Sequence, residues 1–333
     1  MFIIQSYSTA ILFCVITMLC WGSWANTQKL AAKSWRFELF YWDYVIGILL
    51  FSIISAFTLG SMGEEGRSFI TDLKQASSSN IRSALLGGVI FNAANILLSA
   101  AIAIAGMAVA FPVGIGIALV LGVIVNYSAD QKGNSVLLFA GVAMVVIAIL
   151  FNAAAYRKKD VGAQKVSSKG ILLSVVAGVL MSLFYRFIAD SMDLENFVSP
   201  AAGKMTPYTA VFIFSVGIFL SNFIFNSILI KKPFVGEPTS YAEYFRGNFR
   251  THSTGILGGL IWGLGNSFNL IAAGKAGAAI SYGLGQGATL IAALWGVFIW
   301  KEFKNSPKGT NALVTAMFFF FVAGLTLLIL SGL

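Results

Sequence analysis

The chain consists mainly of long apolar runs joined by short polar connections. A helix needs about 20 predominantly apolar residues to cross the hydrocarbon core of a bilayer, and ten runs approach or exceed that length. We therefore predict an all-α polytopic membrane protein with ten transmembrane helices. The predicted spans cover residues 8–28, 39–60, 82–105, 107–127, 135–155, 169–188, 206–230, 254–273, 276–300 and 311–332.

The composition agrees with this pattern. Hydrophobic residues make up 58% of the 333 residues and charged residues only 11%, whereas soluble domains carry about 25% charged residues. The mean hydropathy is +0.84. The formal net charge of +9 comes from Lys and Arg in short loops between apolar runs, so membrane topology explains it and nucleic-acid binding is not expected.

The basic residues are unevenly divided between the two sides of the predicted membrane. The connections after spans 1, 3, 5, 7 and 9 hold 15 of the 22 Lys and Arg residues, and the other side holds 7. Basic residues favour the cytoplasmic side. We predict a multi-pass protein of the cell inner (plasma) membrane, with the connection after span 5 cytoplasmic and both termini outside.

An internal repeat divides the chain into two halves. When the sequence is shifted by 171 residues, glycine and asparagine positions coincide without a gap. Each half holds five spans, an odd number, so the second half must be inverted relative to the first. We predict two inverted five-helix repeats, residues 1–160 and 161–333, within one membrane domain. The matched positions are Gly87–Gly88 with Gly258–Gly259, Asn95 with Asn266, Gly106 with Gly277, Gly114 with Gly285, and Gly116 with Gly287.

Small residues recur at every fourth position in both halves. In lipid, small side chains let helix backbones approach closely and so carry helix association. We predict that both stripes are packing interfaces, which could also slide. They comprise Gly106, Ala110, Gly114, Ala118 and Gly122, and Gly277, Ser281, Gly285, Thr289 and Ala293.

Several motifs resemble known transporter families. Residues 259–277, GLIWGLGNSFNLIAAGKAG, and 282–286, YGLGQ, resemble bacterial glucose/ribose uptake permeases. The segment WGVFIWKE at 295–302 is similar to the ninth helix of the drug/metabolite transporter superfamily. The segments CWGSWANTQK at 20–29 and YWDY at 41–44 resemble ureide permeases. These resemblances imply ten helices in two inverted halves, and transport of sugars or of ureides and nucleobases.

The central connection departs from one of these families. Plant ureide permeases carry a long central cytosolic loop with a nucleotide-binding-like motif. Here the connection over residues 156–169 is short and contains no G-x-x-x-x-G-K-[ST] pattern. The sequence therefore gives no support for ATP use, and no cofactor is expected.

Aromatic and amide side chains share one face near the end of the first span. Trp21, Trp24 and Gln28 fall at i, i+3 and i+7, and Asn26 lies nearby. Indole rings suit the apolar face of a sugar, while amides bond to its hydroxyls. The alternative is an aromatic belt at the membrane interface.

Further polar pairs lie inside predicted spans, where unpaired polar groups are costly and often mark transport pathways. Asn95 and Asn266 are repeat equivalents, so we expect them to approach the pseudo-twofold axis from opposite halves. The alternative is interhelical hydrogen bonding that only holds the bundle together. The candidates are Asn92 with Asn95, Asn266 with Asn269, and Tyr282 with Gln286.

Asp43, near the start of the second span, is the candidate for coupling transport to protons. A buried carboxylate with a raised pKa is a common means of such coupling. The alternative is an interfacial salt bridge to Lys29, Lys33 or Arg36. No Cys, His and Asp cluster has metal-ligand spacing, and no catalytic motif occurs, so an enzyme is not expected.

The leading hypothesis is an importer of a small neutral polar solute, most plausibly a pentose or hexose, that works by alternating access. A ureide, nucleobase or nucleoside importer is the alternative, since indoles and amides serve planar heterocycles equally well. A drug/metabolite exporter is less favoured because helix 1 has no acidic residue. A passive channel fits a twofold inverted repeat less well. The expected partners are the solute, the lipid bilayer and a coupling ion, with the protein a monomer or homodimer.

Overall fold

The computed structural model describes residues 1–31, 35–105, 107–159 and 167–333. Within these ranges the chain is almost entirely helical, and ten helices or broken helices are long and apolar enough to cross a membrane. The prediction of ten spans is therefore confirmed. The first nine elements are α1 (Tyr7–Ser23), α2 (Ala25–Ala31), α3 (Phe37–Phe57), α4 (Phe69–Gln75), α5 (Ser78–Ala105), α6 (Met107–Ala129), α7 (Ser135–Lys159), α8 (Ser168–Asp190) and α9 (Pro207–Lys231). The remaining elements are α10 (Tyr241–Phe245), α11 (Phe249–Ala276), α12 (Ala278–Gly285), α13 (Ala288–Leu294), a π-helical turn (Trp295–Ile299) and α14 (Thr310–Leu330).

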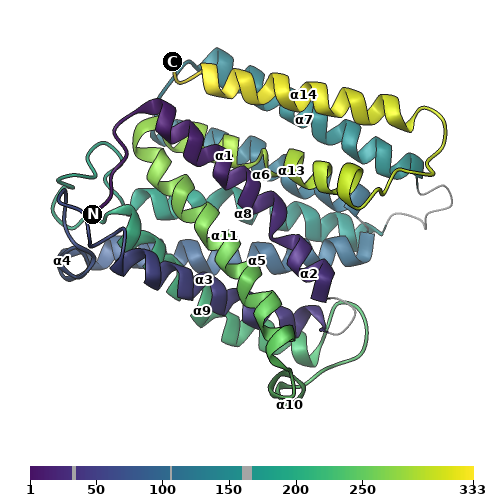
Figure 1. Ribbon diagram of the computed structural model, residues 1–333, viewed down its shortest axis with the longest axis horizontal. Helices are drawn as coiled ribbons and strands as arrows, with labels where there is room; N and C mark the ends of the chain where they lie inside the picture. Colours follow the sequence, from purple (N-terminus) through teal and green to yellow (C-terminus); the bar gives the residue numbers. More distant parts are fainter. Residues whose placement is uncertain (32–34, 106, 160–166) are drawn as a thin grey trace.

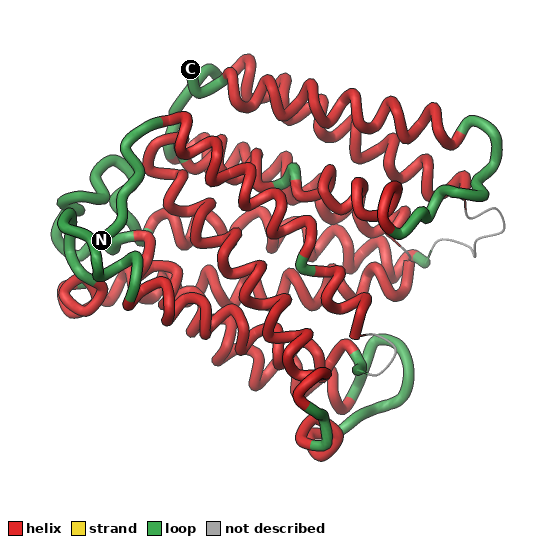
Figure 2. The backbone as a smooth tube through the Cα atoms, in the orientation of Figure 1, coloured by secondary structure: helices red, strands yellow, loops and turns green. Residues whose placement is uncertain are grey.

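The helices run roughly lengthwise between two ends of the molecule. Both termini and α4 lie at one end, at the left in Figure 1, which we call the terminal end. The short helix α10 lies at the opposite end, which we call the α10 end. Green connections gather at these two ends and the red helices fill the space between them in Figure 2, as expected for a bundle whose polar connections lie outside the bilayer.

The two sequence halves interlock rather than forming separate domains. Helix α5 packs along α8, and α3 and α1 both pack along α11. Helices α7 and α14 pack on each other at the edge of the bundle, at the top of Figure 1. Spans from both halves therefore share one core.

Close helix crossings occur at glycines that the repeat had matched. A Cβ atom on Gly259 would lie 2.0 Å from the Tyr44 carbonyl oxygen on α3, and one on Gly88 would lie 2.1 Å from the Phe214 carbonyl oxygen on α9. No side chain fits there unless the helices separate. Gly122 of the first small-residue stripe meets Tyr282 in the same way, at 2.2 Å. Gly106 of that stripe lies outside the described residues.

Two spans that the sequence predicts as continuous helices contain a short interruption of the regular α-helical hydrogen bonding, although the backbone angles there stay helical. The first span breaks at Trp24, between α1 and α2, and the ninth breaks between α12 and α13. Near the first break, the Asn26 amide donates to the Ser23 carbonyl and the Thr27 hydroxyl donates to the Trp24 carbonyl. Such local bonds compete with the helical pattern. The breaks are neighbours in space, since a Cβ on Gly22 would lie 2.5 Å from the Ala288 carbonyl oxygen.

Candidate functional site

A large cavity lies where the two broken spans meet. Its volume is about 780 Å³, within the range of small-molecule sites. Trp21, Trp24 and Gln28 line it from the first broken span, and Gln286 and Thr289 line it from the second. The cavity extends to the α10 end, where its rim is formed by Lys29, Arg36, Glu38, Tyr156, Phe234, Val235, Gly236, Trp300 and Glu302.

Aromatic rings form the deeper walls of the cavity. Trp21 and Trp262 lie nearly parallel, with ring centroids 5.8 Å apart and an interplanar angle of 8°. Phe91 lies 4.4 Å from Trp262, and Trp24 lies 4.5 Å from Tyr44. Trp262 is packed between other rings and is only 5% exposed. The half-buried Trp21 and Trp24 are therefore the rings that can offer a face to a planar solute.

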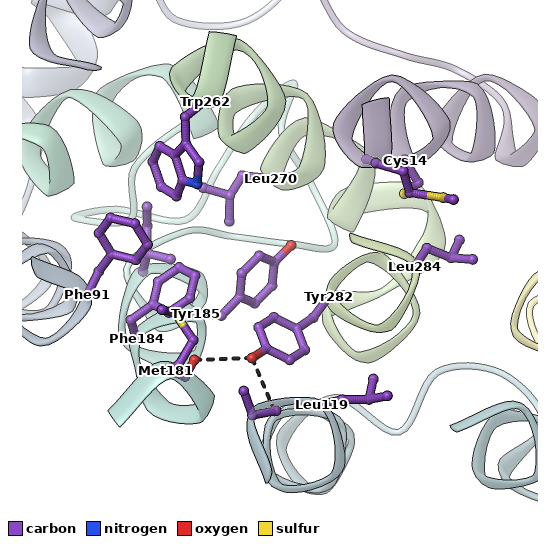
Figure 3. Close-up of a cluster of buried hydrophobic side chains, with 14 of the residues drawn as sticks. Cys14, Phe91, Leu119, Met181, Phe184, Tyr185, Trp262, Leu270, Tyr282 and Leu284 are labelled. Atoms are coloured by element: carbon purple, nitrogen blue, oxygen red, sulfur yellow. Dashed lines mark hydrogen bonds between the residues drawn. The ribbon is translucent and has the colours of Figure 1, made fainter. Parts of the chain in front are cut away.

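A packed layer closes the cavity on the side of the terminal end. The fully buried Tyr282 donates its hydroxyl to the backbone carbonyls of Ala118 and Met181, at 3.1 Å in each case. Its ring lies 5.2 Å from that of Tyr185, and Figure 3 shows both rings packed beside Phe184. The predicted site residue Tyr282 therefore does not line the cavity and instead helps to seal it.

The two asparagines on α5 have different surroundings. Tyr41 donates its hydroxyl to Asn92 at 2.9 Å, and Asn92 donates to Ser221 at 2.9 Å, with all of these groups buried. Asn92 thus holds α3, α5 and α9 together. Asn95 donates to Tyr41 at 3.1 Å but also lines the cavity and is 7% exposed. Asn95 can therefore contact a solute, whereas Asn92 cannot.

Two further amides face the cavity and make no hydrogen bond to a described residue. Gln286 stands at the break between α12 and α13 and is 7% exposed. No hydrogen bond joins the side-chain amide of Gln286 or Gln28 to any residue that the structure describes. Asn26 also lines the cavity, but its amide is occupied, because it donates to Ser23 and accepts from the Trp300 indole at 2.7 Å.

The asparagines on α11 lie beyond the cavity wall. Asn266 and Asn269 are fully buried and are not part of the lining. Asn269 donates to the Ser281 carbonyl at 2.8 Å. Within the described residues, the side-chain oxygens of both asparagines lack a hydrogen-bond partner. Their predicted contact with solute is not made in this conformation, and their role in binding stays a prediction.

Asp43 lies at the α10 end, outside the cavity lining. It accepts from the Trp35 indole at 2.9 Å and the Tyr244 hydroxyl at 2.8 Å, and the His252 Nδ1 lies 2.8 Å away. Burial and the neighbouring carboxylate raise the pKa of Tyr244, so its hydroxyl remains a donor. Asp43 thus ties α10 and the start of α11 to α3, and its coupling role stays a prediction.

Two of the three salt-bridge partners named as the alternative for Asp43 pair with other carboxylates. Lys29 pairs with Glu302, and Arg36 pairs with Glu38, because these carboxylates lie closer to them in the fold. Lys33, the third expected partner, lies outside the described residues. Spacing along the sequence gave no sign of His252, which is 209 residues from Asp43.

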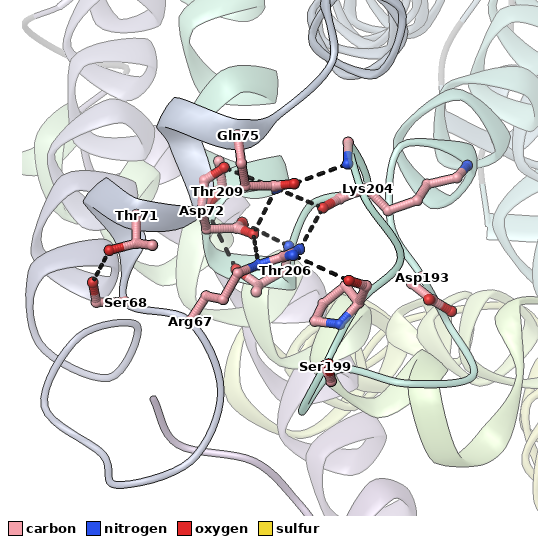
Figure 4. A network of polar contacts seen from close by, with 12 residues as sticks. Arg67, Ser68, Thr71, Asp72, Gln75, Asp193, Ser199, Lys204, Thr206 and Thr209 are labelled. Atoms are coloured by element: carbon pink, nitrogen blue, oxygen red, sulfur yellow. Dashed lines mark hydrogen bonds and ion pairs between the residues drawn. The ribbon is translucent and has the colours of Figure 1, made fainter.

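A second buried carboxylate ties connections together at the terminal end. Asp72 on α4 accepts from Arg67 at 3.0 Å and from the backbone amide of Thr206 at 2.8 Å. Arg67 also donates to the carbonyls of Pro200 and Lys204 (Figure 4). Helix α4 is thereby fixed to the connection that precedes α9, on the closed side of the cavity.

Sequence reasoning missed several residues that line the cavity. Three aromatic residues of the lining lie within apolar spans, and hydropathy alone does not distinguish them from core residues. They are Phe91, Phe184 and Trp262. Lys29 was considered only as a possible partner of Asp43, and Glu302 only as the end of the segment 295–302. The one available signal was the position of Trp262 within the permease-like segment 259–277.

Comparisons with known proteins agree on one family. A sequence model described as ureide permease matches residues 40–169 and 159–331. Ureide permease 2 of Arabidopsis thaliana is 26% identical over 395 aligned positions, covering 100% of this chain and 99% of the relative. Probable ureide permease A3 of Vigna unguiculata is 22% identical, covering 92% and 99% of the two chains.

Two other comparisons are more limited. Transmembrane protein 144 homolog B of Dictyostelium discoideum is 29% identical over 49% of this chain and 40% of its own length. A solved structure titled only "Crystal structure of protein" has a TM-score of 0.63 at 16% identity and covers 96% of both chains. That likeness supports the fold alone.

Proposed function

Because the chain belongs to the ureide permease family, we propose that it transports a small, uncharged, planar solute of the ureide or nucleobase type across the membrane. The observation that carries this proposal is a cavity lined by aromatic rings and by side-chain amides, of which Gln28 and Gln286 make no hydrogen bond to a described residue. Asn95 and Gln286 lie in position to bond the edge of a heterocycle, while Trp21 and Trp24 line the cavity with their rings. The relatives are named for ureides.

The leading sugar hypothesis is not supported by the comparisons. The cavity chemistry also favours a heterocycle over a sugar. A sugar carries a hydroxyl on most of its carbons, and each hydroxyl that leaves water without a partner weakens binding. A planar ureide presents two faces that need no hydrogen bond and an edge of N–H and C=O groups, which side-chain amides complement.

Alternating access between two inverted repeats is our proposal for the mechanism. The repeat equates α1, α3 and α5 with α8, α9 and α11. The repeat then makes the α5–α8 pair equivalent to the α11–α1 pair, and the α5–α9 pair equivalent to the α11–α3 pair. The two helices pack on each other in each of these four pairs. The same shift of 171 residues places α4 on α10. These correspondences support a twofold relation with the cavity between the halves.

The open end of the cavity indicates the side of the membrane to which this conformation is open. The cavity reaches the α10 end, which holds the connections after the odd-numbered spans and hence most of the basic residues. Under the positive-inside rule this end is cytoplasmic. The conformation is then inward-facing, with the layer around Tyr282 closing the outer path, and import ends with release through the α10 end.

Counterflow in proteoliposomes tests the proposal. The purified chain is reconstituted, loaded with unlabelled allantoin, and exposed to labelled allantoin with an excess of hydantoin, uracil, ribose or glucose outside. We expect hydantoin and uracil to compete and the sugars to have no effect. Competition by sugars alone would reinstate the sugar hypothesis, and an absence of allantoin counterflow would refute the proposed solute class.

A further inference from the structure

All charged side chains that line the cavity, among the residues that the structure describes, are paired. The lining contains Lys29, Arg36, Glu38 and Glu302. Lys29 Nζ lies 2.8 Å from Glu302 Oε1, and Arg36 Nη2 lies 3.2 Å from Glu38 Oε1. The described charges on the rim therefore cancel in two pairs.

The pair between Lys29 and Glu302 is held from several sides. The Tyr156 hydroxyl donates to Glu302 Oε2 at 2.7 Å, and Lys29 Nζ lies 4.1 Å from the centre of the Trp300 ring. The Trp300 indole is in turn bonded to Asn26. Lys29 lies on α2 and Glu302 in the connection that follows the ninth span, so the pair joins the ends of the two spans at the cavity mouth.

Glu302 remains charged in this setting. Burial acts to raise its pKa, but the hydrogen bonds from Lys29 and Tyr156 and the positive charges nearby outweigh it and hold the pKa below its usual value. Lys29 therefore faces an ionised carboxylate at neutral pH. Its side chain is 46% exposed and that of Glu302 is 24% exposed, so each charge would act on a passing solute if its partner were removed.

The second ion pair of the cavity lining joins Arg36 and Glu38. Two guanidinium nitrogens of Arg36 donate to the two carboxylate oxygens of Glu38, at 3.2 Å each. Arg36 also donates to the Glu237 carbonyl, which places the 234–236 segment of the rim beside it. Because Arg36 is occupied by these bonds, it does not offer a free anion-binding fork to a solute.

We propose that the pairing of Lys29 with Glu302 at the cavity mouth makes the carrier select uncharged cyclic ureides over open-chain ureide carboxylates, with Glu302 as the specificity-determining residue. This inference rests on the proposed function. Without Glu302, Lys29 would stand as an unpaired positive charge above an aromatic cavity and would attract anions. A charge acting over about 8 Å at an effective dielectric constant of about 40 changes relative binding about fivefold.

The test compares allantoin, which is uncharged, with allantoate, its open-chain carboxylate. Each is used as a competitor of labelled allantoin in proteoliposomes that contain the full chain. The ratio of their inhibition constants is measured in Glu302→Gln, which leaves Lys29 unpaired, and in Lys29→Gln, which leaves Glu302 unpaired. We expect allantoate to gain about fivefold over allantoin in the first variant and to lose about fivefold in the second.

Two controls separate charge from structure. The double variant Lys29→Glu with Glu302→Lys restores a pair and should restore the wild-type ratio. Lys232→Gln removes an exposed charge at the same end but outside the cavity lining, and should leave the ratio unchanged. Shifts in the same direction in both single variants, or no shift while allantoin is still carried, would overturn the inference. If the wild type carries no allantoin, the proposed function fails instead.

Discussion

Mutation of the two asparagines on α5 can separate a role in solute binding from a role in stabilising the fold. We consider Asn92→Ala and Asn95→Ala, the same change made three residues apart on one helix. Asn92 makes three buried hydrogen bonds, to Tyr41, Ser221 and the Ile218 carbonyl. Buried polar bonds between membrane helices contribute about 0.6 kcal/mol each, so losing three should lower the free energy of unfolding by about 2 kcal/mol.

Asn95→Ala should affect solute binding more than stability. Asn95 makes one side-chain bond to Tyr41, so the change should cost only about 0.6 kcal/mol of stability. It also removes an amide from the cavity, and a lost hydrogen bond of about 1 kcal/mol weakens solute binding about fivefold.

Both quantities can be measured on the same detergent-purified samples. Unfolding followed by tryptophan fluorescence gives stability, and titration with allantoin gives the dissociation constant. We expect Asn92→Ala to be the less stable variant with nearly unchanged affinity, and Asn95→Ala to be the weaker binder. If Asn92→Ala weakens binding more than Asn95→Ala at equal stability, the placement of the site is wrong.

Two further changes test the helix crossing and the broken ninth span. Gly259→Ala should lower the unfolding temperature by several degrees, because its Cβ would lie 2.0 Å from the Tyr44 carbonyl oxygen. Gly116→Ala, whose Cβ would have nothing within 4 Å, should leave the unfolding temperature unchanged or raise it. Equal shifts of the two variants in a thermal unfolding assay would contradict this packing. Gln286→Ala should weaken allantoin binding about fivefold with little loss of stability, since its amide makes no bond to a described residue; unchanged affinity would exclude it from the site.

Hydropathy predicted the ten spans because a bilayer imposes length and apolarity on every crossing segment. The same signal could not predict where a span breaks. The breaks at Trp24 and at Gln286 depend on local backbone bonds and on contact between two distant helices, as at Gly22 and Ala288. A sliding average over about 20 residues does not register either feature.

The sequence predicted the residue types that form the candidate site, but not which of these residues reach the cavity. Asn92 and Asn95 stand at i and i+3, so the sequence places both on one side of α5. Their different roles come from Tyr41, which lies between them and was read only as part of an aromatic motif. Two partners of Asp43, Tyr244 and His252, come from more than 200 residues away, and no spacing rule connects positions so far apart.

The helix breaks explain why the cavity lies where it does. A continuous helix buries its backbone groups and presents side chains at fixed spacing, so two packed helices of small residues would leave little space between them. At Trp24 and at Gln286 the regular α-helical hydrogen bonding is interrupted, and the side chains at these positions line the cavity. Aromatic rings and side-chain amides bound the remaining space. A solute that is flat, uncharged and polar at its edge matches those boundaries, and the paired charges at the mouth present no net charge to it.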